Sequence, residues 1–168
     1  NLPGKLEAKI AVDSKYWMWI NGELAVFEGG LKRGPSPNGT YYDKVDIAPF
    51  LKKGKNTIAI LLWHFGKQGF SHNSSGHAAL IFEAVSPDLE ILSDPSWLCI
   101  PNPAYGDTDA PHPNYRLSES NIRYDARNEL PAWNMPGFDA RGKMHGAEIV
   151  DDIVWPAMGG LVERPIPM

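Results

Sequence analysis

The sequence has almost none of the features of a disulfide-bonded, membrane-spanning or nucleic-acid-binding chain. Its single cysteine, Cys99, excludes an internal disulfide in a chain of 168 residues. No apolar run reaches the roughly 18 residues that a transmembrane helix needs. The net charge is −4 and the basic residues form no stripe, which makes nucleic acid an unfavourable partner. The chain begins with Asn1 rather than Met, so we expect a processed protein or a piece of a longer one.

Signals for long helices are also missing. No window shows a sustained helical period of apolar residues, and 16 Gly and 15 Pro divide the chain with turn signals. Six Trp, six Tyr and six Phe argue against disorder and supply material for a core. Many short apolar segments between turn signals predict an all-β fold, a β-sandwich.

The first half of the chain has the clearest strand signals. Residues 5–12 alternate between apolar and charged, as a strand with one buried face does. Asn21-Gly22 separates two apolar segments and predicts a two-residue hairpin turn, because both turn positions need positive φ. Gly29 and Gly30 are expected to end the second strand of that hairpin. Further strands are predicted over residues 40–47, 56–65 and 77–85.

The sequence also predicts which faces of the strands are buried. Residues 56–65 are apolar on both faces, which favours a central strand. Trp17 and Trp19 point away from the core face of their strand. We expect the second half of the chain to cover them, with a contact to another domain or a ligand as the alternative. Residues 101–113 hold four prolines and are expected to be irregular. Short strands are predicted over residues 90–92, 97–100, 121–125, 148–150 and 161–162.

Several motifs occur in an order that resembles one family. The resemblance begins with residues 16–22 (YWMWING) and continues with the Y-D, D-x-x-x-x-L and G-x-N positions of residues 42–58. The family that these motifs resemble is the N-terminal β-sandwich module of bacterial α-L-rhamnosidases, glycoside hydrolase family 78. Ser96-Trp97, residues 124–139 (YDAR to FD) and residues 161–167 resemble later motifs of that module. Two places depart from the family pattern. Residues 63–67 replace a Gly-Trp loop, and Ile122-Arg123 stand where the family has Gly-Glu.

The resemblance implies a fold and a role. The fold is a jelly-roll-like β-sandwich, galactose-binding-domain-like, over residues 1–160, with residues 161–168 as an exit segment toward a downstream catalytic domain. The family's catalytic carboxylates lie in an (α/α)6 barrel, for which this sequence has no helical signal. The implied role is a non-catalytic module that packs on the barrel and shapes substrate access. The parent is expected to be a periplasmic or extracellular enzyme acting on α-L-rhamnosides.

Two other functions are open: an independent carbohydrate-binding module and a self-contained hydrolase. Sugars stack on aromatic rings and hydrogen bond to polar side chains, and the loop after residues 56–62 is rich in both. Alternatively, these aromatic residues continue a buried strand or contact another domain. The expected ligands are rhamnose-containing glycans. The predicted carbohydrate-binding residues are Trp63, His64, Phe65, Gln68, Phe70, His72 and Asn73.

Other chemistry has less support in the sequence. Residues 69–73 (GFSHN) resemble a nucleophile elbow only superficially, because the final glycine is absent and no helix is predicted to follow. The three histidines between residues 64 and 77 lack zinc-type spacing. We therefore predict no catalytic residue, no metal ligand and no cofactor. A structural calcium ion is left open, without ligands.

Overall fold

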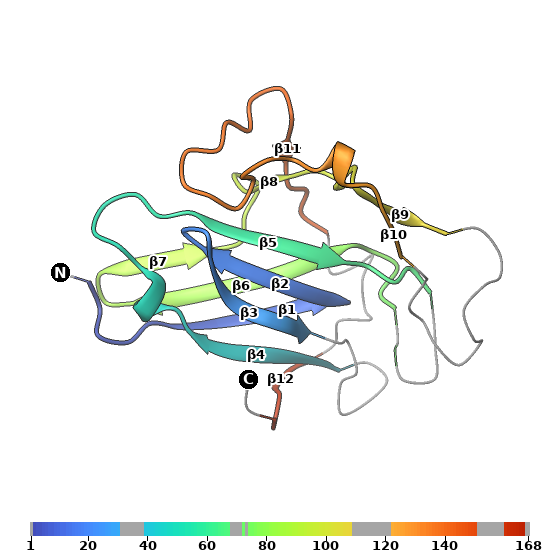
Figure 1. The fold of residues 1–168 in the computed structure, drawn as a ribbon. Coiled ribbons are helices and arrows are strands. Elements are labelled where there is room, and N and C mark those ends of the chain that lie inside the picture. Colours follow the sequence, from blue (N-terminus) through green and yellow to red (C-terminus); the bar gives the residue numbers. More distant parts are fainter. Residues whose placement is uncertain are drawn as a thin grey trace.

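Two facing β-sheets form the sandwich in the computed structural model, which describes residues 2–30, 39–67, 72, 74–108, 122–150 and 160–166 (Figure 1). The larger sheet has the strand order β12-β4-β1-β6-β7 and the smaller one β3-β2-β5. The predicted all-β sandwich is confirmed. Within the described ranges, no helix has the length and apolar character to cross a membrane. The strands are β1 Glu7–Asp13, β2 Lys15–Ile20, β3 Glu23–Gly30, β4 Thr40–Asp46, β5 Ile58–Trp63, β6 Ala79–Ser86, β7 Leu89–Leu92, β8 Leu98–Cys99, β9 Tyr105–Asp107, β10 Ile122–Tyr124, β11 His145–Gly146 and β12 Leu161–Glu163, and the 3-10 turns are η1 Ala48–Phe50 and η2 Ala126–Asn128.

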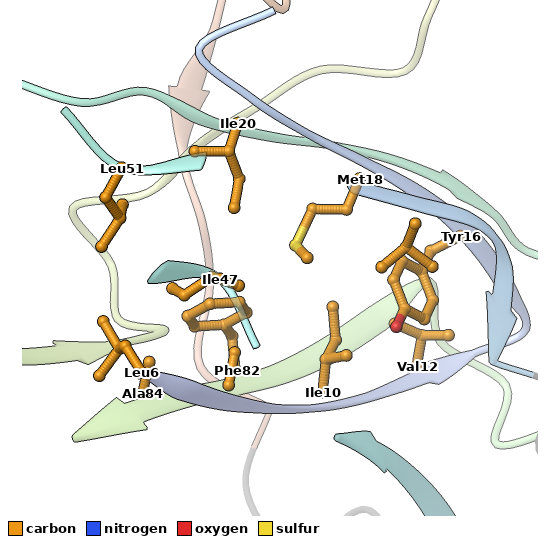
Figure 2. Packing of buried hydrophobic residues seen from close by; sticks show 12 residues of the cluster. Leu6, Ile10, Val12, Tyr16, Met18, Ile20, Ile47, Leu51, Phe82 and Ala84 are labelled. Carbon is orange, nitrogen blue, oxygen red and sulfur yellow. The ribbon is translucent and has the colours of Figure 1, made fainter. Parts of the chain in front are cut away.

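The hydrophobic core fills the space between the two sheets. Figure 2 shows Ile10 and Val12 of β1 facing Met18 and Tyr16 of β2, with Phe82 of β6 beside them. Each of these five side chains is at most 1% exposed. Full burial of one such side chain stabilises the fold by about 1.5–3 kcal/mol. The apolar face of residues 5–12 is therefore the inward face of β1, as the alternation predicts.

The Asn21-Gly22 turn is confirmed. Asn21 has a φ of 54° and Gly22 a φ of 84°, the positive values that this hairpin turn requires. The Asn21 side-chain amide donates hydrogen bonds to the Phe50 carbonyl (2.9 Å) and to Asn56 Oδ1 (2.8 Å). The side-chain oxygen Oδ1 of Asn21 accepts a hydrogen bond from the Thr57 N–H at 3.0 Å. The turn is thus joined to the segment that leads into β5.

Gly29 and Gly30 are the last two residues of β3, as predicted, and both are still paired within the strand. Gly29 lies opposite Tyr16, and a Cβ atom at Gly29 would come within 2.3 Å of the tyrosine ring. Gly30 has a φ of 89°, and its N–H donates to Oδ2 of the buried Asp43 at 2.9 Å. At the end of the strand the glycines therefore allow a close approach of the Tyr16 and Asp43 side chains.

The prediction of a central strand over residues 56–65 is wrong. Among the described strands, β5 pairs with β2 alone and lies at the edge of the smaller sheet. Its outward-facing Ala59 is 8% exposed and lies opposite Trp19. Trp133 from the second half packs edge-to-face on Trp19, with ring centroids 5.3 Å apart. A strand is apolar on both faces when both faces are covered, and this does not require a partner at each edge. The expected cover over Trp19 is confirmed.

The second half forms short strand pairs, β10-β9 and β11-β8. The predicted irregularity of residues 101–113 is wrong for β9, which pairs with β10. Prolines precede this three-residue strand but do not occupy it, so its backbone donors remain available. Residues 148–150 form no strand, and the pairing segment lies earlier, in β11. Cys99 is exposed on β8.

The chain returns to the larger sheet near its end. β12 runs parallel to β4, with Leu161 opposite Thr40. Arg164 follows β12, and its Nε lies 2.7 Å from Oδ1 of Asp43, whose side chain is 1% exposed. The described part of residues 161–168 is therefore an edge strand followed by a largely buried ion pair.

Candidate functional site

The described members of the predicted sugar-binding set lie at and after the end of β5. Trp63 and His64 are half-buried, whereas Phe65 is 6% and His72 2% exposed. Phe65 and His72 therefore face the protein interior. The sugar-binding role of the set stays a prediction. Three other members lie outside the described residues: Gln68, Phe70 and Asn73.

The aromatic side chains of this region pack on one another. The Phe65 ring lies 4.9 Å from Trp63 and 4.9 Å from His72, centroid to centroid, and both contacts are edge-to-face. The Lys15 ammonium lies 5.8 Å from the centroid of the Trp63 ring, within the range of a cation–π contact. Together these contacts form a small aromatic cluster that joins the end of β5 to residue 72.

A buried carboxylate adjoins the aromatic cluster. The side chain of Asp13, at the end of β1, is 0% exposed. Its Oδ1 accepts a hydrogen bond from the Ser14 hydroxyl at 2.6 Å. Its Oδ2 accepts from both the N–H and the hydroxyl of Ser75 at 2.5 Å, and from the Ser74 hydroxyl at 3.3 Å. A buried charge needs such partners, and Asp13 takes them from its neighbour Ser14 and from Ser74 and Ser75, which lie 61 and 62 positions away.

Two histidines and a backbone amide complete this Asp13 cluster. His72 Nε2 lies 3.2 Å from Asp13 Oδ1 and 3.2 Å from Ser14 Oγ. His64 Nδ1 lies 3.6 Å from the same carboxylate oxygen. The Phe65 N–H donates to Ser14 Oγ at 3.1 Å. The cluster thus connects the β1–β2 corner, the end of β5 and the segment before β6.

The electrostatics of the cluster favour an ionised Asp13. Burial by itself would raise the pKa of this carboxyl group, because it disfavours the charged form. Hydrogen bonds from His72, Ser14 and Ser75 outweigh burial and hold the pKa below its ordinary value of 3.8. Asp13 could not be predicted from the sequence, since nothing local distinguishes it among the 20 acidic residues of the chain.

An aspartate, a histidine and a serine lie together here, but their arrangement is not that of a hydrolytic triad. A triad needs the histidine between its partners, with one ring nitrogen facing each. In this cluster Nε2 of His72 faces both Asp13 and Ser14, and Nδ1 is buried with no hydrogen-bond partner among the described residues. Ser14 is 0% exposed, so its hydroxyl cannot reach a substrate. We interpret the cluster as structural.

Metal binding has no cluster to support it in the part of the chain that the structure describes. There, no group of three or more His, Cys, Asp or Glu side chains is placed to hold a metal ion. Asp13 with its two neighbouring histidines is instead a hydrogen-bonded unit within the fold.

Early motif residues that carry the family resemblance have structural partners. Oδ1 of Asp46 accepts from the N–H groups of Leu6 (3.0 Å) and Ala48 (3.1 Å), so it links the start of β1 to η1. The Asn56 side chain accepts from the Lys52 N–H and donates to the Lys52 carbonyl, both at 2.8 Å. Asp46 and Asn56 thus stabilise turns through their side chains. This explains why these residue types occur at fixed positions in the motif.

The later Y-D-A-R segment is held by its own side chains. Arg127 makes a two-point contact with Asp125, at 2.8 Å and 2.6 Å, and the Tyr124 hydroxyl donates to Glu129 at 2.7 Å. The ring of Tyr124 lies 5.0 Å from that of Tyr105 on the paired strand β9. Because the Arg127 side chain is 88% exposed, this ion pair adds little stability.

The outer side of the smaller sheet carries exposed apolar side chains. Phe27 is 70% exposed and packs edge-to-face on Trp17, with centroids 6.4 Å apart. Leu24, opposite Trp19 on β3, is 44% exposed. We call Trp17, Leu24 and Phe27 the aromatic face. Adjoining exposed apolar groups of this kind are typical of contact surfaces.

No protein-family model and no curated protein matches the chain. Solved structures do match. A GH78 family rhamnosidase of Bacillus sp. GL1 has a TM-score of 0.84 and 27% identity, over 99% of this chain and 17% of that one. An α-L-rhamnosidase from Dictyoglumus thermophilum has a TM-score of 0.67 and 22% identity, over 97% and 17%. An α-L-rhamnosidase of Streptomyces avermitilis, solved with L-rhamnose, has a TM-score of 0.61 and 22% identity, over 88% and 14%.

The fold is therefore that of a β-sandwich module found within larger glycoside hydrolases. The larger proteins in question are α-L-rhamnosidases, which confirms the resemblance that the motifs predict. The chain spans only 17% of the length of the first of these structures.

Proposed function

We propose that this chain is a non-catalytic module of an α-L-rhamnosidase-like glycoside hydrolase, and that it packs against the catalytic domain of the same polypeptide and shapes substrate access. One observation carries the proposal. Nearly the whole chain, 99% of it, superimposes on a rhamnosidase at a TM-score of 0.84 while covering 17% of that enzyme. The chain thus resembles one part of an enzyme that is several times longer.

The use of the motif residues supports a scaffold role. Asn21, Asp46 and Asn56 hold turns together, and Asp13 holds three segments in a buried cluster. Reactive groups must instead face a cleft that a substrate can enter. Internal hydrogen bonds of this kind give a rigid module, which is what a supporting domain needs.

The aromatic face is the surface that we assign to the contact with the catalytic domain. Its most exposed member, Phe27, has 70% of its surface in water, with Trp17 beside it. Burying a side chain of this size gains about 1.5–3 kcal/mol. A neighbouring domain that covered this face would gain that energy without reorganising the core.

The variant Phe27→Glu tests the contact. Phe27 is largely exposed in the module, so the isolated chain should melt at an unchanged temperature. In the parent polypeptide, where the face is buried, the same change should lower the melting temperature and separate the module's transition from that of the catalytic domain. The matched control is Val85→Glu, 52% exposed on the other sheet, which should leave both proteins unchanged. An unchanged parent would contradict the assigned surface.

Two further predictions from the sequence concern a sugar site and the location of the parent protein. A sugar site in the loop after β5 would rest on the half-buried Trp63 and His64. Titration of the chain with rhamnose-containing oligosaccharides, followed by tryptophan fluorescence, tests it, and Trp63→Ala should abolish any response. Periplasmic or extracellular location of the parent is the second, and fractionation of the source cells tests it.

A further inference from the structure

The outer face of the larger sheet has a small hollow above its middle strand. Ala11 of β1 forms its floor, and Tyr42 of β4, Ile81 of β6 and Leu161 of β12 form its walls. β1 lies between β4 and β6 in the sheet, as Figure 1 shows. The hollow exists because the small alanine lies between larger neighbours, with Ile81 directly opposite it. Its volume is about 200 Å³.

A charged pair lines the same hollow. Lys9 and Glu83 are cross-strand partners, and the Lys9 ammonium lies 2.9 Å from Glu83 Oε1. Their side chains are 46% and 47% exposed, so both groups can still reach a ligand. An ammonium has three donor hydrogens and a carboxylate has several acceptor positions. The pair therefore keeps donors and an acceptor beside an apolar hollow.

The size and chemistry of the hollow restrict its ligand. It is smaller than the roughly 300–1,000 Å³ of pockets for drug-sized molecules, so it suits one sugar ring. Its walls are apolar at Ile81 and Leu161, where a methyl group would be favoured over a hydroxyl. Lys9 and Glu83 are placed to bind vicinal hydroxyl groups of the same ring. A hexose with a methyl group in place of its 6-hydroxymethyl group has this combination.

We propose that the hollow at Lys9, Ala11, Ile81 and Glu83 binds a terminal 6-deoxyhexose, with the methyl group against Ile81 and Leu161. The choice of sugar class rests on the proposed function, because a rhamnosidase acts on glycans that carry this sugar class. The site is on the sheet opposite to the aromatic face, so a docked catalytic domain would leave it open. The module would then hold one end of the glycan while the catalytic domain acts elsewhere on it.

Titration by NMR tests the site. L-Rhamnose, a 6-deoxyhexose, is added to the uniformly ¹⁵N-labelled chain, and L-mannose, which differs from it only in having a 6-hydroxyl, serves as the matched sugar. We expect saturable shifts of the amides around residues 9–11 and 81–83, with a dissociation constant on the order of a millimolar. L-Mannose should bind at least about tenfold more weakly, because its hydroxyl would lie on the apolar wall.

Variants locate the binding on the Lys9–Glu83 pair. Glu83→Gln should weaken rhamnose binding about tenfold, as expected for the loss of a hydrogen bond to a charged group. Glu90→Gln, an exposed change on the neighbouring strand β7, should leave it unchanged. Dispersed spectra of both variants would show that they are folded.

Several outcomes would overturn the site. They are the absence of shifts, shifts confined to the loop after β5, equal affinity for the two sugars, or equal effects of the two variants. Activity of the parent separates this proposal from the one on which it rests. A parent that hydrolyses aryl α-L-rhamnosides while the chain shows no shifts at the hollow refutes the sugar site alone. An inactive parent with rhamnose bound at the hollow refutes the proposed enzyme and leaves the site standing.

Discussion

Replacing Asp13 by Asn is the most informative single change to the fold. The side chain keeps its shape but loses its charge, and one acceptor oxygen becomes an NH₂ group. In the wild-type protein, one carboxylate oxygen faces Ser75 and the other faces Ser14 and His72, so either choice of NH₂ position loses an acceptor. Because the carboxylate is 0% exposed, no water replaces the lost contacts. Leaving buried donors without their acceptor costs about 1–3 kcal/mol, and more where the lost acceptor is charged.

Urea unfolding followed by tryptophan fluorescence measures this cost, and the melting temperature should fall on the order of 10 °C for a chain of this length. The control is Asp94→Asn. Asp94 also has a pKa below its ordinary value because of Ser96, but it is exposed, so its change should have little effect. Equal stability losses for the two variants would refute the argument from burial.

The difference in stability between the wild type and Asp13→Asn should depend on pH. The pKa of Asp13 is lower in the folded chain than its ordinary 3.8, so the stability it contributes is fully present above pH 3.8 and is lost as the pH falls below it. The gap in unfolding free energy between wild type and Asp13→Asn should therefore narrow by about 1.4 kcal/mol for each pH unit below that value. A gap that stays constant down to pH 2 would show that Asp13 is not a stabilising carboxylate.

Three further predictions concern the fold and the site. Gly22→Val should lower the free energy of unfolding by about 1–3 kcal/mol, because Gly22 has a φ of 84° and a Cβ there would meet Met135 Sδ at 2.2 Å. In a double-mutant cycle, adding Met135→Ala should restore part of that stability. If it restores none, the whole cost comes from the backbone strain of the turn. Phe65→Ala should cost about 3–5 kcal/mol in urea unfolding, since the ring is 6% exposed, and a loss near zero would mean that the ring is not core. Far-ultraviolet circular dichroism should show mainly β structure, and a helix content above about a quarter would contradict the fold.

The sequence predicts those parts of the fold that local patterns determine. The alternation of residues 5–12 identifies the inward face of β1, and Asn21-Gly22 identifies the hairpin, because both depend on neighbouring residues only. The edge position of β5 could not be predicted, since its apolar outer face comes from a cover, not from a second neighbouring strand. Trp133, more than 100 residues away from Trp19 in the chain, supplies part of that cover.

The candidate site shows the same limit more clearly. Sequence reasoning identified the aromatic and histidine content of the segment after β5, and the structure packs Trp63, Phe65 and His72 into one cluster. It could not identify Asp13, which is a common residue at the end of a strand. The role of Asp13 arises from Ser75 and His72, which the fold brings to it from a distant segment.

Whether the chain is a non-catalytic module is decided by comparing two proteins in the hydrolysis of an aryl α-L-rhamnoside: the isolated 168-residue chain and the parent polypeptide that contains it. If the chain is a non-catalytic module of a rhamnosidase, the parent will release the aryl group and the chain will not. Turnover by the purified chain that is lost on changing one of its own acidic residues would contradict the account, and so would a parent with no activity on rhamnosides.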